Sequence, residues 1–441
     1  MFNNYKNTFH MLRGKSILFC AGLVVASVSL QAQLLYNGGT QVAVTGGGVL
    51  YVEGAVENAN GLFSNAGYTT VNGYFKNGGT ATGGGAATGV YYVSGDWINN
   101  STFTADQSNV VLDGSSQSIT GSSASTFYNL TLNTPGSVKT QTIDANVNNI
   151  DSLNDCELAT GDYKMNILNA DPAAIVRGVG FVSSTGPGRL TRAANTTNTY
   201  LFPTGWNDNG NIVYRPVEMS PSDANPQTFN VRLAYDNPTS ENYDTATKAG
   251  NVTLVNGKYF HLIKQIGSTS PADLTIYYDP SADGQWSSIG RWQDLPQWTD
   301  LANTTTATGS PLSSRTKPNW KDDGNEPHAL INAVIVTTLF TFPNVFDPGS
   351  NDPLNSTFHV IDFGTFVTVQ AMRIYDRWGE IVYDSQRDGT MRSYYGANTY
   401  AWDGTYQGKK QLMGNYIYTA SIKINETGEV KTVSGNLALV R

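Results

Sequence analysis

The sequence predicts an all-β protein, and three observations support this prediction. Glycine is abundant at 45 residues, the 24 tyrosines outnumber the 17 phenylalanines, and Thr, Val and Asn recur throughout. No long segment places apolar residues at i, i+3, i+4 and i+7, the spacing of an amphipathic helix. Short alternating runs separated by Gly, Asn, Asp and Ser are typical of strands joined by turns. We expect a leader, a parallel β-helix or β-solenoid-like region, a middle β-sandwich and a C-terminal Ig-like β-sandwich.

Residues 1–32 have the order of a secretory signal peptide. Lys6, Arg13 and Lys15 precede an apolar stretch from Ser16 to Leu30, and the small residue Ala32 follows. The apolar stretch is too short for a comfortable membrane span. We therefore expect cleavage after Ala32 and no transmembrane span in the processed chain.

The charge balance of the processed chain excludes some partners. Removing three basic residues from the 27 in the chain leaves 24 against 35 acidic residues, a net charge of −11 with neutral histidine. Nucleic acids and anionic membranes need basic patches, so we expect neither as a partner. Cys156 is the single cysteine after processing, which excludes an intramolecular disulfide.

A short phrase repeats in the region of residues 33–170. It reads apolar, any residue, Gly, any residue, apolar or aromatic, any residue, Asn, and it occurs at Val52 to Asn58, Val71 to Asn77 and Val93 to Asn99, with an echo at Leu112 to Gly114. A period near twenty predicts stacked coils, because one unit cannot bury its apolar face alone. We attribute Gly and Asn to corners with positive φ. A meander of hairpins with Gly-rich turns is the alternative.

Residues 171–341 have longer alternating runs, such as Phe229 to Tyr235 and Leu274 to Tyr278, which predict a β-sandwich. Residues 342–441 begin at a Pro-punctuated stretch. Their clearest strand places Tyr416, Tyr418, Ala420, Ile422 and Ile424 on one face. About 100 residues with this alternation predict a small Ig-like sandwich.

Two motifs in this last region carry a family resemblance. The first runs from Ile374 through Arg377, Trp378 and Gly379 to Tyr383. The second comprises Trp402, Asp403, Gly404, Gly408 and the run from Gly414 through Tyr416 to Tyr418, and the chain closes on Arg441. These motifs resemble the gliding motility-associated C-terminal domain family, over about a quarter of the chain. The turn at Asp347 to Asp352 is an irregular version of the family's pattern, which weakens a cation-binding role for that loop.

The resemblance implies a type B sorting signal of the type IX secretion system. It implies export through that machinery, an outer-membrane partner protein that receives the tail, and a location in the extracellular space or on the outer-membrane surface. The signal peptide is the partner feature that this route requires.

Residues 33–170 lack the groups that lyase or glycosidase chemistry needs. They contain no Arg and no His, and Lys76, Lys139 and Lys164 are the only cationic residues. A uronate lyase needs cations and a base, and a glycosidase needs two facing carboxylates. Nothing aligns the acidic residues of this region on one face. We expect no enzyme activity and no cofactor.

Metal binding also has weak support in the sequence. His261, His328 and His359 have no paired spacing, which argues against zinc. The loops Asp279 to Gly284 and Asp322 to Asn325 are rich in oxygen ligands, but neither continues to the distal Glu of an EF-hand. We interpret them as solvated turns.

Three tryptophans are the strongest candidates for ligand contact in the middle region. Trp286, Trp292 and Trp298 recur at six-residue spacing, which would place them on one face of an extended stretch. Exposed rings would stack on sugars, whereas buried rings would fill the sandwich core.

The sequence therefore predicts a surface-displayed cargo with a structural or adhesive passenger at residues 33–341. A passenger that binds or degrades carbohydrate, with a glycan or cell-surface polymer as ligand, is one alternative. A component of the gliding or secretion apparatus itself is the other.

Overall fold

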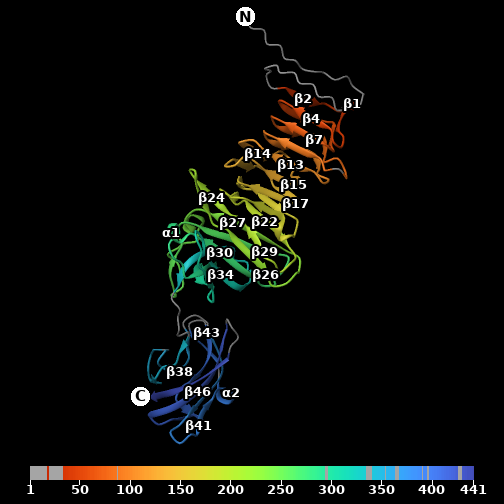
Figure 1. The fold of residues 1–441 in the computed structure, drawn as a ribbon. Coiled ribbons are helices and arrows are strands. Elements are labelled where there is room, and N and C mark those ends of the chain that lie inside the picture. Colours follow the sequence, from red (N-terminus) through yellow and green to blue (C-terminus); the bar gives the residue numbers. More distant parts are fainter. Residues whose placement is uncertain are drawn as a thin grey trace. The chain divides into compact units, whose positions relative to one another are not determined.

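The computed structural model describes residues 17–18, 33–86, 88–293, 296–333, 340–352, 354–362, 367–389, 391–394, 397–425 and 430–441. The predicted signal peptide lies outside the described residues except for the short strand β1 (Ile17–Leu18). The chain forms two compact units, Met1–Val334 and Ile335–Arg441, which are described separately below (Figure 1). The predicted all-β class is confirmed, since more than half of the residues lie in strands.

The first unit begins as a β-solenoid of about 8 turns. Three parallel sheets form its walls, and the parallel pairing excludes a meander of hairpins. The first sheet comprises β1, β3 (Gln41–Val44), β6 (Leu62–Asn65), β9 (Thr80–Thr82) and β12 (Thr102–Thr104). The second comprises β2 (Leu34–Asn37), β5 (Ala55–Asn58), β8 (Phe75–Asn77), β11 (Trp97–Asn99), β14 (Ser116–Thr120), β16 (Val138–Gln141), β18 (Glu157–Ala159) and β21 (Phe181–Ser183). The third begins with β4 (Val49–Val52), β7 (Tyr68–Val71), β10 (Val90–Val93), β13 (Asn109–Leu112), β15 (Ser125–Leu132), β17 (Ala145–Asn154), β19 (Lys164–Ile167) and β22 (Arg189–Ala194).

The repeat asparagines form a ladder inside the solenoid. Asn37 donates from Nδ2 to Oδ1 of Asn58 at 2.8 Å, Asn58 to Asn77 at 2.9 Å, and Asn77 to Asn99 at 3.0 Å. All four side chains are buried. Each amide also reaches a backbone carbonyl, such as Thr102 O from Asn77 at 2.9 Å. The expectation that these asparagines supply positive φ is wrong: they satisfy one another between coils.

The structure also gives a different reason for the repeat glycines from the one that the sequence suggested. Gly54, Gly73, Gly95 and Gly114 have no positive φ. A Cβ on Gly114 would lie 1.9 Å from the carbonyl oxygen of Ser94 in the preceding coil. The repeat therefore requires Gly because adjacent coils approach too closely for any side chain.

The third sheet continues from the solenoid into the sandwich. Up to β22 its strands are parallel, and from β22 to β27 the pairing becomes antiparallel. The parallel ladder thus extends beyond residue 170, where the sequence suggested a boundary. The added strands are β27 (Gln227–Ala234), β29 (Phe260–Ile266), β35 (Pro327–Ala333), β31 (Ser288–Gln293) and β32 (Gln297–Asp300), with β20 (Ile175–Arg177) and β28 (Val252–Val255) paired at the side. One hydrophobic core extends from Val52 to Leu330, so the sandwich covers the C-terminal end of the solenoid.

A second antiparallel sheet completes the sandwich. It comprises β23 (Tyr200–Phe202), β26 (Val217–Pro221), β30 (Ala272–Tyr278), β34 (Ser313–Trp320) and β33 (Thr305–Ala307). The connecting elements are the hairpin of β24 (Gly205–Asp208) and β25 (Asn211–Tyr214), and the short helices η1 (Pro172–Ala174), η2 (Pro238–Glu241) and α1 (Pro280–Asp283).

The second unit is a small sandwich with its own core. Its larger sheet has the order β37 (Val345–Phe346), β47 (Val430–Leu439), β46 (Gly414–Ile424), β40 (Val367–Tyr375) and β41 (Ile381–Asp384). The smaller sheet comprises β38 (Phe358–His359), β43 (Ala397–Trp402) and β42 (Met391–Tyr394). Short pairs are β36 (Phe340–Thr341) with β39 (Ile361–Asp362) and β44 (Thr405–Tyr406) with β45 (Lys409–Lys410), and α2 (Ser385–Asp388) follows β41.

Candidate recognition end of the C-terminal domain

The turn between β40 and β41 presents an exposed tryptophan. Oδ1 of Asp376 accepts hydrogen bonds from the backbone N–H groups of Trp378 and Glu380, both at 2.9 Å. Gly379 has φ +84°, a conformation that favours glycine. The side chain of Trp378 is 70% exposed, and the guanidinium of Arg377 lies 4.0 Å from the centre of its ring. The turn thus holds a large apolar ring and a cation together in solvent.

A second turn, at residues 403–408, is shaped in the same way. Oδ1 of Asp403 accepts from the backbone N–H of Thr405 at 2.9 Å and from its hydroxyl at 2.8 Å. Gly404 and Gly408 have φ +75° and +74°. Trp402 is buried beneath the turn and donates from Nε1 to the carbonyl oxygen of Thr405 at 2.8 Å. The tryptophans of the two motifs therefore have opposite roles, since Trp402 packs in the core and Trp378 faces solvent.

The last residue of the chain closes this second turn. Arg441 donates from Nη1 to the carbonyl oxygen of Gln411 at 2.6 Å and from Nη2 to that of Gly404 at 3.2 Å. Strand pairing places Leu439 opposite Gly414 at the same end of β46 and β47. A terminal arginine at this position is thus part of the folded domain.

The two turns and the chain end lie at one end of the sandwich. Tyr416 packs on Trp402 with ring centres 5.1 Å apart and donates its hydroxyl to the carbonyl oxygen of Leu412 at 2.7 Å. Tyr375 pairs with Ile417, so the turn after β40 lies beside Tyr416, and Arg441 joins the chain end to the turn at Gly404. Burial raises the pKa of Tyr416. We call this region the recognition end, and its most exposed apolar side chains are those of Trp378, Leu412 and Met413.

The sequence motifs led to most of this end but missed two residues. Leu412 and Met413 are 71% and 64% exposed in the loop before β46. Their signal in the sequence is an apolar pair between Gly408 and Gly414, where the surrounding turn residues are polar. Tyr418, in contrast, lies farther along β46 and packs against Phe342, with ring centres 4.7 Å apart.

The three passenger tryptophans form no exposed row. Trp286 and Trp298 are buried, and Trp292 packs against Trp298 with ring centres 5.8 Å apart. Trp292 and Trp298 face each other across the β31–β32 hairpin, whereas Trp286 precedes β31 and joins the main core. The sugar-stacking hypothesis for these three residues is therefore corrected, because the six-residue spacing spans a hairpin.

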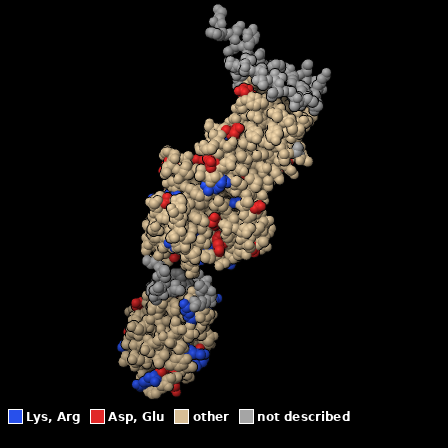
Figure 2. Space-filling model, in the orientation of Figure 1, with Lys and Arg blue, Asp and Glu red and all other residues tan. Residues whose placement is uncertain are grey.

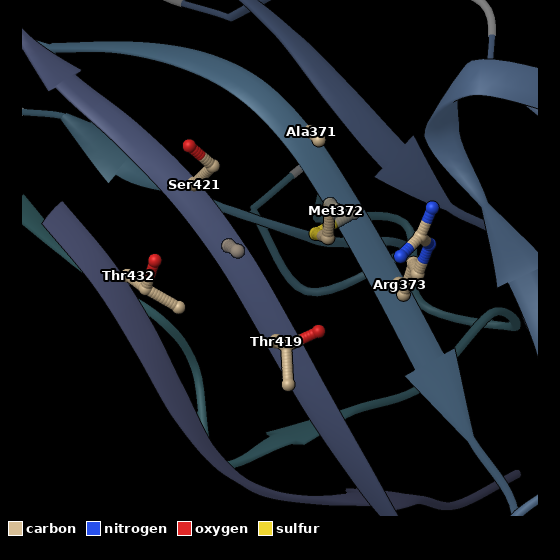
Figure 3. A pocket seen from close by; sticks show the side chains of 7 residues that line it. Ala371, Met372, Arg373, Thr419, Ser421 and Thr432 are labelled. Atoms are coloured by element: carbon tan, nitrogen blue, oxygen red, sulfur yellow. The ribbon is translucent and has the colours of Figure 1, made fainter. Parts of the chain in front are cut away.

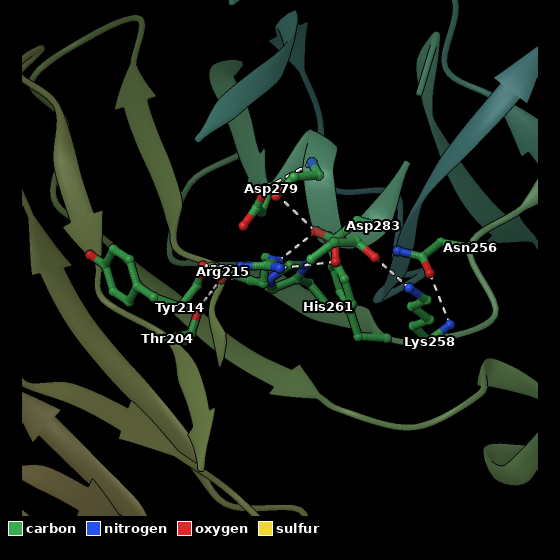
Figure 4. Close-up of polar contacts among 11 residues, drawn as sticks. Thr204, Tyr214, Arg215, Asn256, Lys258, His261, Asp279 and Asp283 are labelled. Atoms are coloured by element: carbon green, nitrogen blue, oxygen red, sulfur yellow. Dashed lines mark hydrogen bonds and ion pairs between the residues drawn. The ribbon is translucent and has the colours of Figure 1, made fainter. Parts of the chain in front are cut away.

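The first Asp/Gly loop of the middle region is held by protein groups. Asp283 forms an ion pair with Arg215 at 2.6 Å, with both side chains about 5% exposed or less, and accepts the hydroxyl of Tyr259 at 2.8 Å (Figure 4). Asp279 caps α1 by accepting from the backbone N–H of Ser281 at 2.9 Å.

The second Asp/Gly loop is likewise engaged. Asp322 accepts from the backbone N–H of Gln265 at 2.7 Å, and Asp323 pairs with Arg291 at 2.7 Å. In the described part of the chain, no group of three or more His, Cys, Asp or Glu side chains is placed to hold a metal ion.

A shallow hollow on the larger sheet of the C-terminal domain does not add a site. Small and polar side chains line it, including Ala371, Thr419, Ser421 and Thr432 (Figure 3). It lies beside the register shift between Val369 and Ala371, so a β-bulge accounts for it.

Comparison with known proteins identifies the C-terminal domain. Residues 340–439 match the family model of the CHU_C type IX secretion signal domain, which confirms the resemblance of the two motifs. No curated protein and no solved structure matches the chain. The match supports a cargo protein of type IX secretion that interacts with this machinery and is exported to the cell surface or the extracellular space. Among the described residues, no helix is long and apolar enough to cross a membrane.

Proposed function

We propose that this protein, whose residues 340–439 form a CHU_C type IX secretion signal domain, carries a non-enzymatic passenger with a structural or adhesive role. The passenger is the first unit, a β-solenoid closed at its C-terminal end by a sandwich. Its polar and acidic side chains are largely engaged in ladders, caps and ion pairs, which supports a structural role. The signal domain delivers this passenger to the cell surface.

We further propose that the recognition end contacts an outer-membrane partner of the secretion machinery. The main observation for this proposal is that Trp378, Leu412 and Met413 are exposed at the end of the domain where the glycines of the two motifs form turns. Exposed aromatic and Met side chains beside an arginine have the composition of interface hot spots. The turn fixed by Asp376 presents Trp378 with little loss of conformational entropy on binding.

A fusion experiment tests the sorting role of the C-terminal domain. The fusion consists of a signal peptide, a fluorescent reporter and residues 340–441, in that order, and it is expressed in a host with the type IX system. We expect the reporter in the medium or on the cell surface, and its retention in the periplasm when the machinery is deleted. An intact, folded reporter that stays in the periplasm of the complete host would contradict the sorting role.

Substitutions then separate recognition from folding. Trp378→Ala combined with Leu412→Ser and Met413→Ser should lower export at least about tenfold, as expected for loss of hot-spot residues. The matched control is Val430→Ser, an exposed apolar residue that pairs with Lys423 at the opposite end of β46 and β47. Equal export of the two variants would exclude the recognition end as the contact surface.

A further inference from the structure

The outer face of the third solenoid sheet carries a patch of tyrosine and valine. Parallel pairing aligns two ranks of outward side chains on three neighbouring strands, β4, β7 and β10. One rank is Val49, Tyr68 and Val90, and the other is Tyr51, Thr70 and Tyr92. Val49, Tyr51 and Tyr68 are 68%, 59% and 48% exposed. Contiguous exposed apolar side chains of this kind mark interaction sites.

The ring of Tyr51 on β4 is held in place before any ligand binds. The hydroxyl of Tyr51 donates to Oε2 of Glu53 at 2.8 Å and accepts from Nδ2 of Asn72 at 2.7 Å. Asn72 follows β7, so the ring of Tyr51 is tethered to the next coil. A tethered ring loses little conformational freedom when a ligand stacks on it.

The patch has almost no charge. Glu53 lies at its rim, and the three lysines of residues 33–170 are accounted for elsewhere. Lys76 pairs with Glu57 at 2.8 Å on the second sheet, and Lys139 is buried. Lys164 lies on β19, four strands beyond β10 in the third sheet. Figure 2 likewise shows few charged side chains on the visible face of the solenoid. An uncharged surface suits an uncharged ligand, because a charged one would lose hydration without gaining an ion pair.

The size of the patch selects the kind of ligand. Three strands about 4.8 Å apart, with two outward positions about 7 Å apart on each, give a patch roughly 10 Å long between Cα atoms. A stable contact between two protein copies needs about 800 Å² from each partner, several times this footprint. A single extended polymer chain lying along the solenoid axis would cover it.

The same face continues as a row of amides and hydroxyls beyond the tyrosines. On β13 and β15, Oδ1 of Asn109 accepts from the hydroxyl of Thr131 at 3.1 Å, and Oδ1 of Asn129 accepts from Asn149 at 2.9 Å. Asn109 and Asn129 follow Val90 in register, whereas the buried Val111 separates Tyr92 from Thr131 in the other rank. A sugar ring can stack on an aromatic side chain through its C–H groups and can form hydrogen bonds through its hydroxyls. Aromatic rings followed by neutral hydrogen-bonding groups suit both kinds of contact.

We propose that the outer face of β4, β7 and β10 binds an uncharged polysaccharide chain, with Tyr51, Tyr68 and Tyr92 as stacking residues. The inference rests on the proposed adhesive role and gives that role a ligand class. It differs from the earlier hypothesis in its residues, because Trp286 and Trp298 are buried and Trp292 packs against Trp298.

A binding experiment on the purified chain of residues 33–441 tests the proposal without using export. The probes are insoluble cellulose and chitin, soluble xyloglucan, and anionic alginate for comparison. We expect retention on at least one uncharged probe and none on alginate. Tyr51→Ala, Tyr68→Ala and Tyr92→Ala together should lower affinity at least about tenfold, because they remove all three rings of the patch.

Two further variants keep the result interpretable. The double variant Leu34→Ala, Tyr36→Ala removes exposed apolar side chains from β2 on the second sheet of the first coil, and it should bind like the unaltered chain. Tyr68→Ala alone should give an intermediate loss in a folded protein. Failure of the unaltered chain to bind any uncharged probe, unchanged binding by the triple variant, or self-association that depends on the three tyrosines would overturn the proposal. Each of these results leaves the fusion experiment on residues 340–441 unaffected.

Discussion

The solenoid and the C-terminal domain use the same residue types for opposite purposes. In the solenoid, Gly114 leaves no room for a Cβ, and Trp97 is fully buried. In the C-terminal domain, Gly408 has open space around it and a positive φ, and Trp378 is exposed. A repeated Gly therefore indicates close packing between coils, whereas the Gly of the terminal motifs shapes turns that present side chains to solvent.

The aromatic contacts follow the same division. Inside the solenoid, Trp97 stacks on Phe75 with ring centres 4.9 Å apart and lies 4.9 Å from Phe103 at a steep angle. Its Nε1 donates to the hydroxyl of Ser125 at 2.9 Å. Trp378 instead has a cation over one face and solvent around it. Burial makes the first ring a structural residue, and exposure makes the second available to a partner.

The asparagine ladder provides the largest expected effect. Asn77→Ala should lower the free energy of unfolding of the passenger by about 4 kcal/mol, because it removes the hydrogen bonds of a buried amide with Asn58, Asn99 and Thr102. Urea unfolding followed by tryptophan fluorescence measures the change. Asn60→Ala, at an exposed site on the same coil, is the control and should change little. Equal stability of the two variants would mean that the ladder contributes nothing.

The ladder also indicates what the sequence could and could not predict. The repeat of Gly and Asn was sufficient to predict stacked coils, because its period is a property of the sequence alone. Why Asn58 and Gly114 stand where they do was predicted incorrectly, since a ladder between coils and a close approach of backbones depend on residues about twenty positions away. The motif of the last domain was recognisable, yet the convergence of Trp378 with Met413 required the pairing of β40, β46 and β47.

The limit of the passenger domain follows from the same reasoning. The change of composition near residue 170 suggested a boundary, but β21 and β22 continue the parallel ladders of the second and third sheets. The third sheet then becomes antiparallel without a break. Amino-acid composition changes near residue 170, but it does not show which strands pair. The solenoid and the sandwich are joined by the pairing of β22 with β27, which are far apart in the sequence.

The glycines permit a direct test of the comparison, with an intermediate effect. Gly114→Ala should cost about 3 kcal/mol, because the new Cβ would lie 1.9 Å from the carbonyl oxygen of Ser94 and the backbone would have to shift. Gly408→Ala should cost about 1 kcal/mol, because only its positive φ opposes a side chain. Thermal unfolding of both variants measures the difference. The same cost at the two sites would remove the distinction between packing glycines and turn glycines.

The smallest expected effect concerns a buried acid in the passenger. Asp151 on β17 is fully buried, and neither of its carboxyl oxygens has a hydrogen-bond partner among the described residues. Burial raises its pKa from 3.8 to about 7, and the positive charge of Arg192 opposes this shift. Because the folded state binds this proton more tightly than the unfolded state, the contribution of Asp151 to stability falls as pH rises from about 4 to about 7.

Two buried histidines act in the opposite direction at lower pH. Burial lowers the pKa of His261 to about 4 and that of His328 to about 3, both from 6.5, so their contribution to stability is lost as pH falls below about 6.5. Both histidines are present in the unaltered protein and in an Asp151 variant, so the difference in stability between the two proteins isolates the effect of Asp151.

Between pH 6.5 and 8, the stability of Asp151→Asn relative to the unaltered protein should rise by about 1 kcal/mol, because the variant has no buried carboxyl that loses a proton. Urea unfolding at several pH values in this range measures the slope of stability with pH. Asp144→Asn, at an exposed site in the same coil, should follow the slope of the unaltered protein. If Asp151→Asn also follows that slope, the carboxyl does not titrate in this range.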